Sequence, residues 1–181
     1  MEPVRLTTER LILDLHRRED FEAFAAMWAE PAVLAPMGRQ PLTPNESWMR
    51  LLQYRGLWPL LGYGYWAIRE KATGRFMGDL GFADFHREIE PSIVGVPEGG
   101  WTLAGWAHGK GFASEALAAA LGWIDAQARF ERTVCIIDPN NRPSIRLAER
   151  HGYAAPVTVE FRGQPTLLFT RSAGCNPPRP T

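Results

Sequence analysis

The chain has 181 residues, of which 45% are hydrophobic and 22% are charged, and its 20 basic and 20 acidic side chains give a formal net charge of zero. These values are typical of one soluble globular domain, and they exclude a disordered chain and a strongly basic nucleic-acid binder. The longest uncharged apolar stretch, around residues 57–66, is far shorter than the roughly 20 residues that a membrane helix requires.

The two cysteines, Cys135 and Cys175, form no C-x-x-C pair. They provide neither a disulfide framework nor a zinc-binding pattern, which favours a reducing compartment. Charged residues rather than an apolar segment follow Met1, so no signal peptide is expected. The sequence therefore predicts a cytoplasmic protein, monomeric or homodimeric, with no nucleic-acid and no membrane partner.

The first third of the chain predicts one strand and two helices. Residues 11–16 form the strand, and residues 19–28 form a helix because their apolar side chains recur three and four positions apart. Four prolines make the segment 30–44 a loop. Thr43 then opens a second helix through a capping box, and this helix ends at Gly56 or soon after.

The remainder of the chain predicts short strands that alternate with helices. The expected elements are strands at 65–69, 75–85 and 100–106, a helix at 113–129, a strand at 133–137, a helix at 143–151 and a hairpin at 157–162 and 166–170. We therefore expect an α/β fold, with a single mixed, mostly antiparallel sheet flanked by helices. It forms one domain over residues 1–171, followed by a flexible C-terminal tail at 172–181.

The strongest chemical pattern is a glycine-rich turn between a strand and a helix, His108-Gly109-Lys110-Gly111-Phe112-Ala113. A helix N-terminus exposes unpaired N–H groups that bind anions, and glycines let the backbone fold tightly around a phosphate. A Walker loop is excluded because Lys110 is followed by glycine, and a dinucleotide-binding turn would have a glycine or alanine in place of Ser114. A tight connection without a ligand is the alternative interpretation.

Five further segments combine with this turn. They are Thr8-Glu9-Arg10-Leu11-Ile12-Leu13, Thr73-Gly74-x-x-x-Gly78, Gly100-Trp101-Thr102-Leu103, Ser114-Glu115-Ala116 and Asn141-x-x-Ser144…Glu149-Arg150-His151-Gly152-Tyr153. Together, from about residue 5 to residue 171, they resemble the GNAT superfamily of N-acetyltransferases, in the branch that includes the ribosomal-protein N-terminal acetyltransferases. The resemblance implies a GNAT-like sheet splayed at a central strand, Gly100–Gly105.

The resemblance also implies the reaction. An acetyl group would pass from acetyl-CoA to a primary amine, either a protein N-terminus or a small molecule, by direct attack. A non-catalytic acyl-CoA-binding module is the alternative, and a dinucleotide-binding domain is a second one. An aromatic-rich stretch before the third strand would lie beside the acceptor and suit an apolar or cationic amine, although most of its side chains are expected in the core. Its members are Trp48, Tyr54, Trp58, Tyr63, Tyr65 and Trp66.

Acetyl-CoA would lie with its pyrophosphate on the backbone amides of the glycine turn. The cofactor-binding residues that the resemblance implies are Leu103, His108, Gly109, Lys110, Gly111, Phe112, Ala113, Ser114 and Asn141. His108 stands where the family motif has Gln or Arg, and a backbone N–H near Leu103 would stabilise the oxyanion at the thioester carbonyl. No metal is expected, because the four histidines are scattered without ligand spacing.

Acetyl transfer further requires a proton donor for the departing thiolate and a base for the amine. Ala148 replaces the tyrosine that many family members use as the donor, so Ser144 becomes the candidate, against the alternative that Ser144 only caps its helix. Glu98 is the candidate base, against the alternative that it is a solvated loop acid. The other carboxylates that stay open as the base are Glu160, Asp79 and Asp84.

Overall fold

One eight-stranded sheet runs through the computed structural model, which describes residues 4–174, in the order β1-β2-β3-β4-β5-β6-β8-β7. The strands are β1 (Leu6–Thr7), β2 (Leu11–Asp14), β3 (Tyr65–Glu70), β4 (Phe76–Ala83), β5 (Glu98–Leu103), β6 (Arg132–Ile137), β7 (Ala154–Phe161) and β8 (Gln164–Ser172). All neighbours are antiparallel except β5 and β6, which are parallel. The predicted mixed sheet is confirmed, and the dinucleotide-binding alternative is wrong because that fold needs a parallel sheet.

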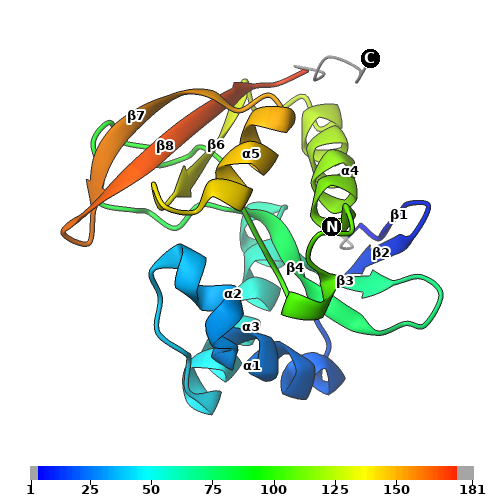
Figure 1. Ribbon diagram of the computed structural model, residues 1–181. Coiled ribbons are helices and arrows are strands. Elements are labelled where there is room, and N and C mark those ends of the chain that lie inside the picture. The colour runs from blue at the N-terminus through cyan, green and yellow to red at the C-terminus, as the bar shows by residue number, and fades with distance from the viewer. Residues whose placement is uncertain (1–3, 175–181) are drawn as a thin grey trace.

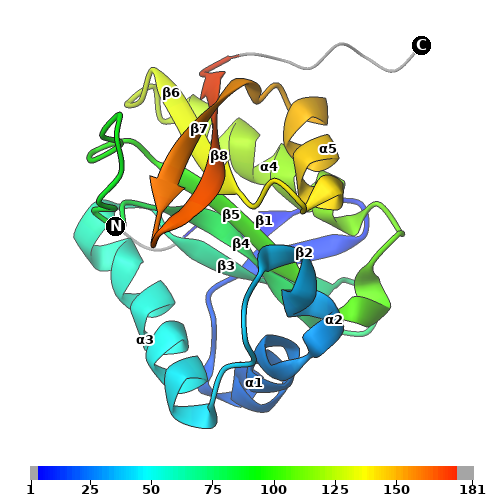
Figure 2. The same cartoon turned by 60° about the vertical axis from the view of Figure 1, so that its left-hand side comes forward.

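Helices cover both faces of this sheet (Figures 1 and 2). They are α1 (Phe21–Ala29), α2 (Pro31–Leu34), α3 (Pro44–Leu61), α4 (Phe112–Ala126) and α5 (Arg142–Arg150), with 3₁₀ turns η1 (Arg18–Asp20), η2 (Ala35–Met37) and η3 (Gly105–Ala107). No helix within residues 4–174 is both long and apolar enough to cross a bilayer.

Alternation along the central strands separates the two faces. Trp66 and Ile68 of β3 pack into the core cluster that α4 and α5 cover, whereas Tyr65 and Ala67 pack into the cluster under α1, α2 and α3. Successive side chains of a strand point to opposite faces, so each face has its own core. We call the first the α4–α5 face and the second the α1–α3 face.

Helix α3 begins as predicted and ends later than predicted. The hydroxyl of Thr43 accepts a hydrogen bond from the N–H of Glu46 at 3.2 Å, which completes the capping box. The helix then continues past Gly56 and Pro59 to Leu61, because the side chains of its last turns, including the buried Trp58, pack against the sheet. Tertiary packing here outweighs the low helix propensity of glycine and proline.

The proline-rich segment 30–44 is not only a loop, which corrects the sequence-based expectation. Its first prolines begin α2 and η2, since proline supplies a helical φ and lacks the N–H that a helix start would leave unpaired. Gly38, at a φ of +61°, ends the second of these turns. This short helical pair carries the chain across the α1–α3 face to the site.

Other elements also differ from the predictions in their presence or their ends. The short strand β1 was not predicted. Strand β5 begins two residues early, at Glu98, and ends at Leu103, because residues 105–107 form η3 rather than more strand. Of the predicted tail, Ser172 is the last residue of β8, and residues 175–181 lie outside the described part of the chain.

Candidate active site

The parallel strands β5 and β6 separate almost as soon as they meet. Their only paired residues are Glu98 and Val134, and one further bond joins the N–H of Val134 to the carbonyl of Pro97 at 3.0 Å. On its other side β5 pairs with β4 along its full length. The predicted splay at this central strand is therefore confirmed.

A cavity of about 520 Å³ lies at this opening. Residues 98–102 of β5 and 135–137 of β6 line its two walls, and side chains from α3, α5 and the β7–β8 hairpin complete it. None of the glycine-turn residues 108–114 lines the cavity. The opening thus separates the glycine turn, on the α4–α5 face, from a second region on the α1–α3 face.

The glycine turn has the conformation that an anion site needs. Gly109 and Gly111 have φ values of +73° and +78°, a left-handed conformation that favours glycine. Gly111 is the N-cap of α4, and no other described residue accepts a hydrogen bond from the backbone N–H groups of residues 109–113. These groups and the positive end of the helix dipole are free for a phosphate.

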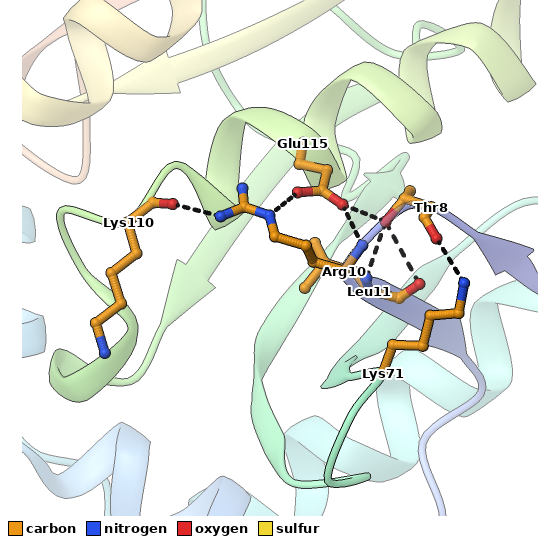
Figure 3. Close-up of polar contacts among 6 residues, drawn as sticks. All are labelled: Thr8, Arg10, Leu11, Lys71, Lys110 and Glu115. Carbon is orange, nitrogen blue, oxygen red and sulfur yellow. Dashed lines mark hydrogen bonds and ion pairs between the residues drawn. The ribbon is translucent and has the colours of Figure 1, made fainter.

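A cluster of polar side chains around Glu115 supports the glycine turn (Figure 3). The sequence analysis did not predict this cluster. The Glu115 carboxylate accepts hydrogen bonds from the hydroxyl of Thr8 at 2.5 Å, from the N–H of Arg10 at 2.8 Å and from Arg10 Nε at 2.6 Å. Arg10 also donates to the Lys110 carbonyl at 3.0 Å. Partial burial raises the pKa of Glu115, but the bonds from Thr8 and Arg10 outweigh it and lower the pKa below its usual value.

Three of the predicted cofactor-binding residues, Leu103, His108 and Ser114, have their side chains in contacts within the protein itself. The Leu103 side chain is buried in the core, and its carbonyl lies 2.7 Å from His108 Nε2, which must carry the proton because a carbonyl can only accept. The hydroxyl of Ser114 lies 2.7 Å from Nε2 of His151, at the end of α5. Any contact of these residues with a cofactor would therefore use the backbone.

Ser144 lies at the opening, and it does not cap its helix. Asn141 is the N-cap of α5, and its Oδ1 accepts from the N–H of Ser144 at 3.2 Å. The Ser144 hydroxyl accepts a hydrogen bond across the opening from the indole of Trp101 on β5, also at 3.2 Å. Ala148, one turn further along α5, is fully buried in the core. The capping interpretation of Ser144 is therefore wrong, and Asn141 fills that role.

Glu98 is not a solvated loop acid. It is 4% exposed, begins β5 and forms a two-point ion pair with Arg87, through Nε and, at 2.7 Å, through Nη2. The Arg87 guanidinium lies between the rings of Phe85 and Phe161, at 4.8 and 4.7 Å from their centroids. The carboxylate is thus fixed at the root of the opening, where it lines the cavity.

The other candidate carboxylates do not line the cavity. Glu160 is exposed on β7, and Asp84 accepts the N–H groups of His86 and Gly95 in a loop. Asp79 on β4 is fully buried beneath the α1–α3 face, where Trp28 donates to its Oδ2 at 3.2 Å and its Oδ1 has no partner. Burial raises the pKa of Asp79 to about 7, although Arg50 and Trp28 oppose the shift.

Aromatic side chains do wall the cavity, but most come from other segments than the predicted stretch. Of that stretch only Tyr54 and Tyr65 contribute, stacked with ring centroids 4.2 Å apart. The other aromatic lining residues are Trp28, Phe85, Trp101 and Phe161. Arginines, which the sequence analysis did not single out, also line the cavity. Within residues 4–174 no group of three side chains is arranged to hold a metal ion.

Comparison with known proteins agrees with this geometry. The family model described as "Acetyltransferase (GNAT) domain" matches residues 10–154. The uncharacterized protein YkkB of Bacillus subtilis is 28% identical over 173 residues, which cover 93% of this chain and 96% of that protein. The structure of a putative GnaT-family acetyltransferase from Bordetella pertussis superposes with a TM-score of 0.82 at 31% identity, covering 94% of this chain and all of that one.

A more distant structure shares the fold alone. It is RimL, a ribosomal L7/L12 alpha-N-protein acetyltransferase in complex with coenzyme A, with a TM-score of 0.74 at 15% identity, covering 96% of this chain and all of that one.

Proposed function

Because the chain belongs to the GNAT family of acetyltransferases, we propose that it transfers an acetyl group from acetyl-CoA to a primary amine by direct attack. The amine nitrogen bonds to the thioester carbonyl carbon, the carbon–sulfur bond breaks, and coenzyme A leaves as a thiolate. The observation that carries the proposal is the separation of β5 from β6 around a cavity, which gives two reactants access from opposite faces.

On the α4–α5 face, the glycine turn supplies the binding site for the pyrophosphate of acetyl-CoA. Its unpaired N–H groups fit a phosphate, and the Glu115 cluster fixes them in place before binding, so little ordering is required on binding. Lys110 adds a positive charge. The N–H near Leu103 is the proposed donor to the oxyanion that forms at the thioester carbonyl.

Ser144 is the proposed proton donor to the thiolate. Because the Trp101 indole can only donate, the Ser144 oxygen accepts in that contact and its own proton stays free to point at sulfur. The buried Ala148 excludes a side-chain donor one turn later, where other family members have tyrosine. Glu98 is the proposed group that attracts the amine and receives its proton, directly or through water, since it is the one candidate base that lines the cavity.

A two-part experiment tests this function. Titration calorimetry should show saturable binding of acetyl-CoA, and a panel of primary amines should release free thiol only in its presence. Tight binding of acetyl-CoA with no thiol release from any amine would contradict the proposed transfer. The acceptor is either a protein N-terminus, as the name of RimL states for that protein, or a small amine. Cytoplasmic location and a monomeric or homodimeric state stay predictions.

A further inference from the structure

The acceptor side of the cavity carries more positive than negative charge. Four arginines line it, Arg39, Arg50, Arg87 and Arg162, against two carboxylates, Glu98 and Asp138. This leaves an excess of two positive charges in a concave site. Arg87 is neutralised by Glu98 in the ion pair described above. The excess positive charge is therefore carried by Arg39, Arg50 and Arg162.

Within residues 4–174, no carboxylate forms an ion pair with Arg39, Arg50 or Arg162. Asp138, the other acid in the cavity wall, instead accepts from the N–H of Asn140 at 2.8 Å and lies against the backbone of Gly38. Among the described residues, no carboxylate forms an ion pair with the half-buried Arg39 or Arg50, which is unusual for arginines that are partly withdrawn from solvent. The exposed Arg162 adds a third guanidinium group to the same cavity wall.

The three arginines come from three different segments of the chain. Arg50, on α3, lies 4.0 Å over the ring of Trp28. Arg39 follows the left-handed Gly38 that ends η2 and is half-buried. Burial lowers the pKa of Arg39, and repulsion from the neighbouring arginines lowers it further. A bound anion would relieve that repulsion.

Arg162 occupies a turn position that favours other residues. It forms the two-residue tip of the β7–β8 hairpin together with Gly163, and both have positive φ, +55° and +72°. Asn, Asp or Gly is preferred at such a position, because a longer side chain is strained there. The turn itself therefore does not explain the arginine, whereas its place beside the cavity does.

From these observations we propose that the acceptor is a small primary amine that also carries an anionic group, a carboxylate or a phosphate-like group, which Arg39, Arg50 and Arg162 bind. The inference rests on the proposed function. Arginine suits both anions because its planar fork forms paired hydrogen bonds with them. The phosphates of acetyl-CoA do not explain the cluster, since the glycine turn lies on the opposite face and contributes nothing to this cavity.

A protein N-terminus fits this cavity poorly. It would bring a cationic amine followed by neutral peptide groups, and it would leave the three guanidinium groups unpaired. A volume of about 520 Å³, part of which the acetyl group must share, is also the size of a small-molecule site. The aromatic wall then stacks on the body of the amine rather than selecting a cation.

Matched amines test the proposal through thiol release. One pair is β-alanine and its carboxamide, and the other is 2-aminoethylphosphonate and ethanolamine. A cationic diamine and a peptide that begins with an acidic residue are assayed beside them. At least one anionic amine should exceed its partner without the anionic group by about 10- to 100-fold in kcat/KM, as charge-assisted hydrogen bonds allow. The two anionic arms show which anion is bound.

Variants connect the preference to the arginines. Arg50→Gln and Arg162→Asn should raise KM for the anionic amine about tenfold or more, with a smaller change in kcat and no change for the partner amine without the anionic group. Arg162→Asn suits the turn, so it should fold at least as stably. Arg55→Gln, an exposed arginine on the same helix as Arg50, is the control and should change neither constant.

Other outcomes overturn the proposal in distinguishable ways. Equal kcat/KM within each pair, or a preference for the diamine or the peptide, would overturn the anionic acceptor and leave the acetyl transfer standing. Tight acetyl-CoA binding with no turnover of any amine would overturn both. Unchanged KM for the anionic amine in Arg50→Gln and Arg162→Asn would overturn the role of the arginines.

Discussion

The two sides of the β5–β6 opening are built in different ways. The cofactor side is local: one turn of consecutive residues, 109–113, presents the amides, and its glycines are visible in the sequence. The acceptor side is assembled from segments that lie more than 120 residues apart, as Arg39 and Arg162 do, among them η2, α3 and the β7–β8 hairpin. A short motif thus identifies the donor, whereas only the folded chain shows what the acceptor must be.

The two sides also differ in how well their polar groups are satisfied. Behind the glycine turn, both oxygens of Glu115 are hydrogen-bonded. Beneath the acceptor side, Asp79 is fully buried with an unpaired Oδ1, and Arg39, Arg50 and Arg162 form no ion pair with any described carboxylate. Unsatisfied buried groups reduce stability and tend to gather at functional sites. We therefore expect that polar groups on the acceptor side serve binding or catalysis and lower the stability of the folded protein.

The largest expected effect is at Ser144, where the two sides meet. Ser144→Ala should lower kcat by about 10²- to 10⁴-fold if its hydroxyl protonates the thiolate. Because Asn141 caps α5, the melting temperature should hardly change. Affinity for acetyl-CoA should also stay close to that of the wild type, since the glycine turn is intact. Steady-state kinetics, calorimetry and thermal unfolding of the same preparation measure all three.

Ser144→Thr is the matched control because it keeps a hydroxyl at the same position. It should recover a large part of the kcat that Ser144→Ala loses. If Ser144→Ala instead melts lower and turns over at the wild-type rate, the residue is structural. Another group would then have to supply the proton.

Much of the fold could be predicted because its determinants are local. The capping box at Thr43, the hydrophobic alternation of the strands and the glycines at 109 and 111 each act within a few residues. The late end of α3 could not be predicted, because Gly56 and Pro59 are overruled by packing against a sheet that lies further along the chain. The helical turns between the prolines were missed since proline also starts helices.

The site divides in the same way. The glycine turn was predicted from its own chemistry, and Ser144 and Glu98 were predicted from the resemblance to a family pattern. The Arg10–Glu115 contact joins residues 105 positions apart, and three of the four arginines of the cavity come from turns or irregular segments, whereas Arg50 comes from α3. The burial of Glu98 was also missed, because its partner Arg87 lies in an irregular segment. Long-range ion pairs and cavities leave no local pattern in one sequence.

The second prediction tests whether the acceptor side reduces stability. The pKa of Asp79 is raised to about 7 in the folded protein, mainly by burial, against an ordinary value near 3.8. Between these two pH values the folded protein keeps a proton that the unfolded chain has released. The contribution of Asp79 to stability is therefore fully present below about pH 4 and falls as the pH rises towards 7.

Asp79→Asn should remove this pH dependence. Relative to wild type, the variant should gain stability as the pH rises from about 4 to 7, by up to a few kcal/mol, and the difference should level off above that. Urea unfolding of both proteins at several pH values measures this difference in the free energy of unfolding. The titration of the carboxylates that both proteins share cancels in the difference. A constant difference across this range would mean that Asp79 is ionised in the folded protein at pH 4.

The smallest expected effect compares two glycines that share the same φ and the same open space around Cα. Gly109 in the cofactor turn and Gly74 in the β3–β4 hairpin both have a φ of +73°, and an added Cβ would meet no atom within 4 Å at either. Alanine at either position should reduce stability by about 1 kcal/mol through backbone strain alone. Only Gly109→Ala should also weaken acetyl-CoA binding, by about tenfold, because relief of the strain turns the amides away from the phosphate.

Thermal unfolding and calorimetry on both variants separate the effect on stability from the effect on acetyl-CoA binding. Equal affinity in the two variants would show that the turn is merely a tight connection, and the cofactor side would then have to be placed elsewhere.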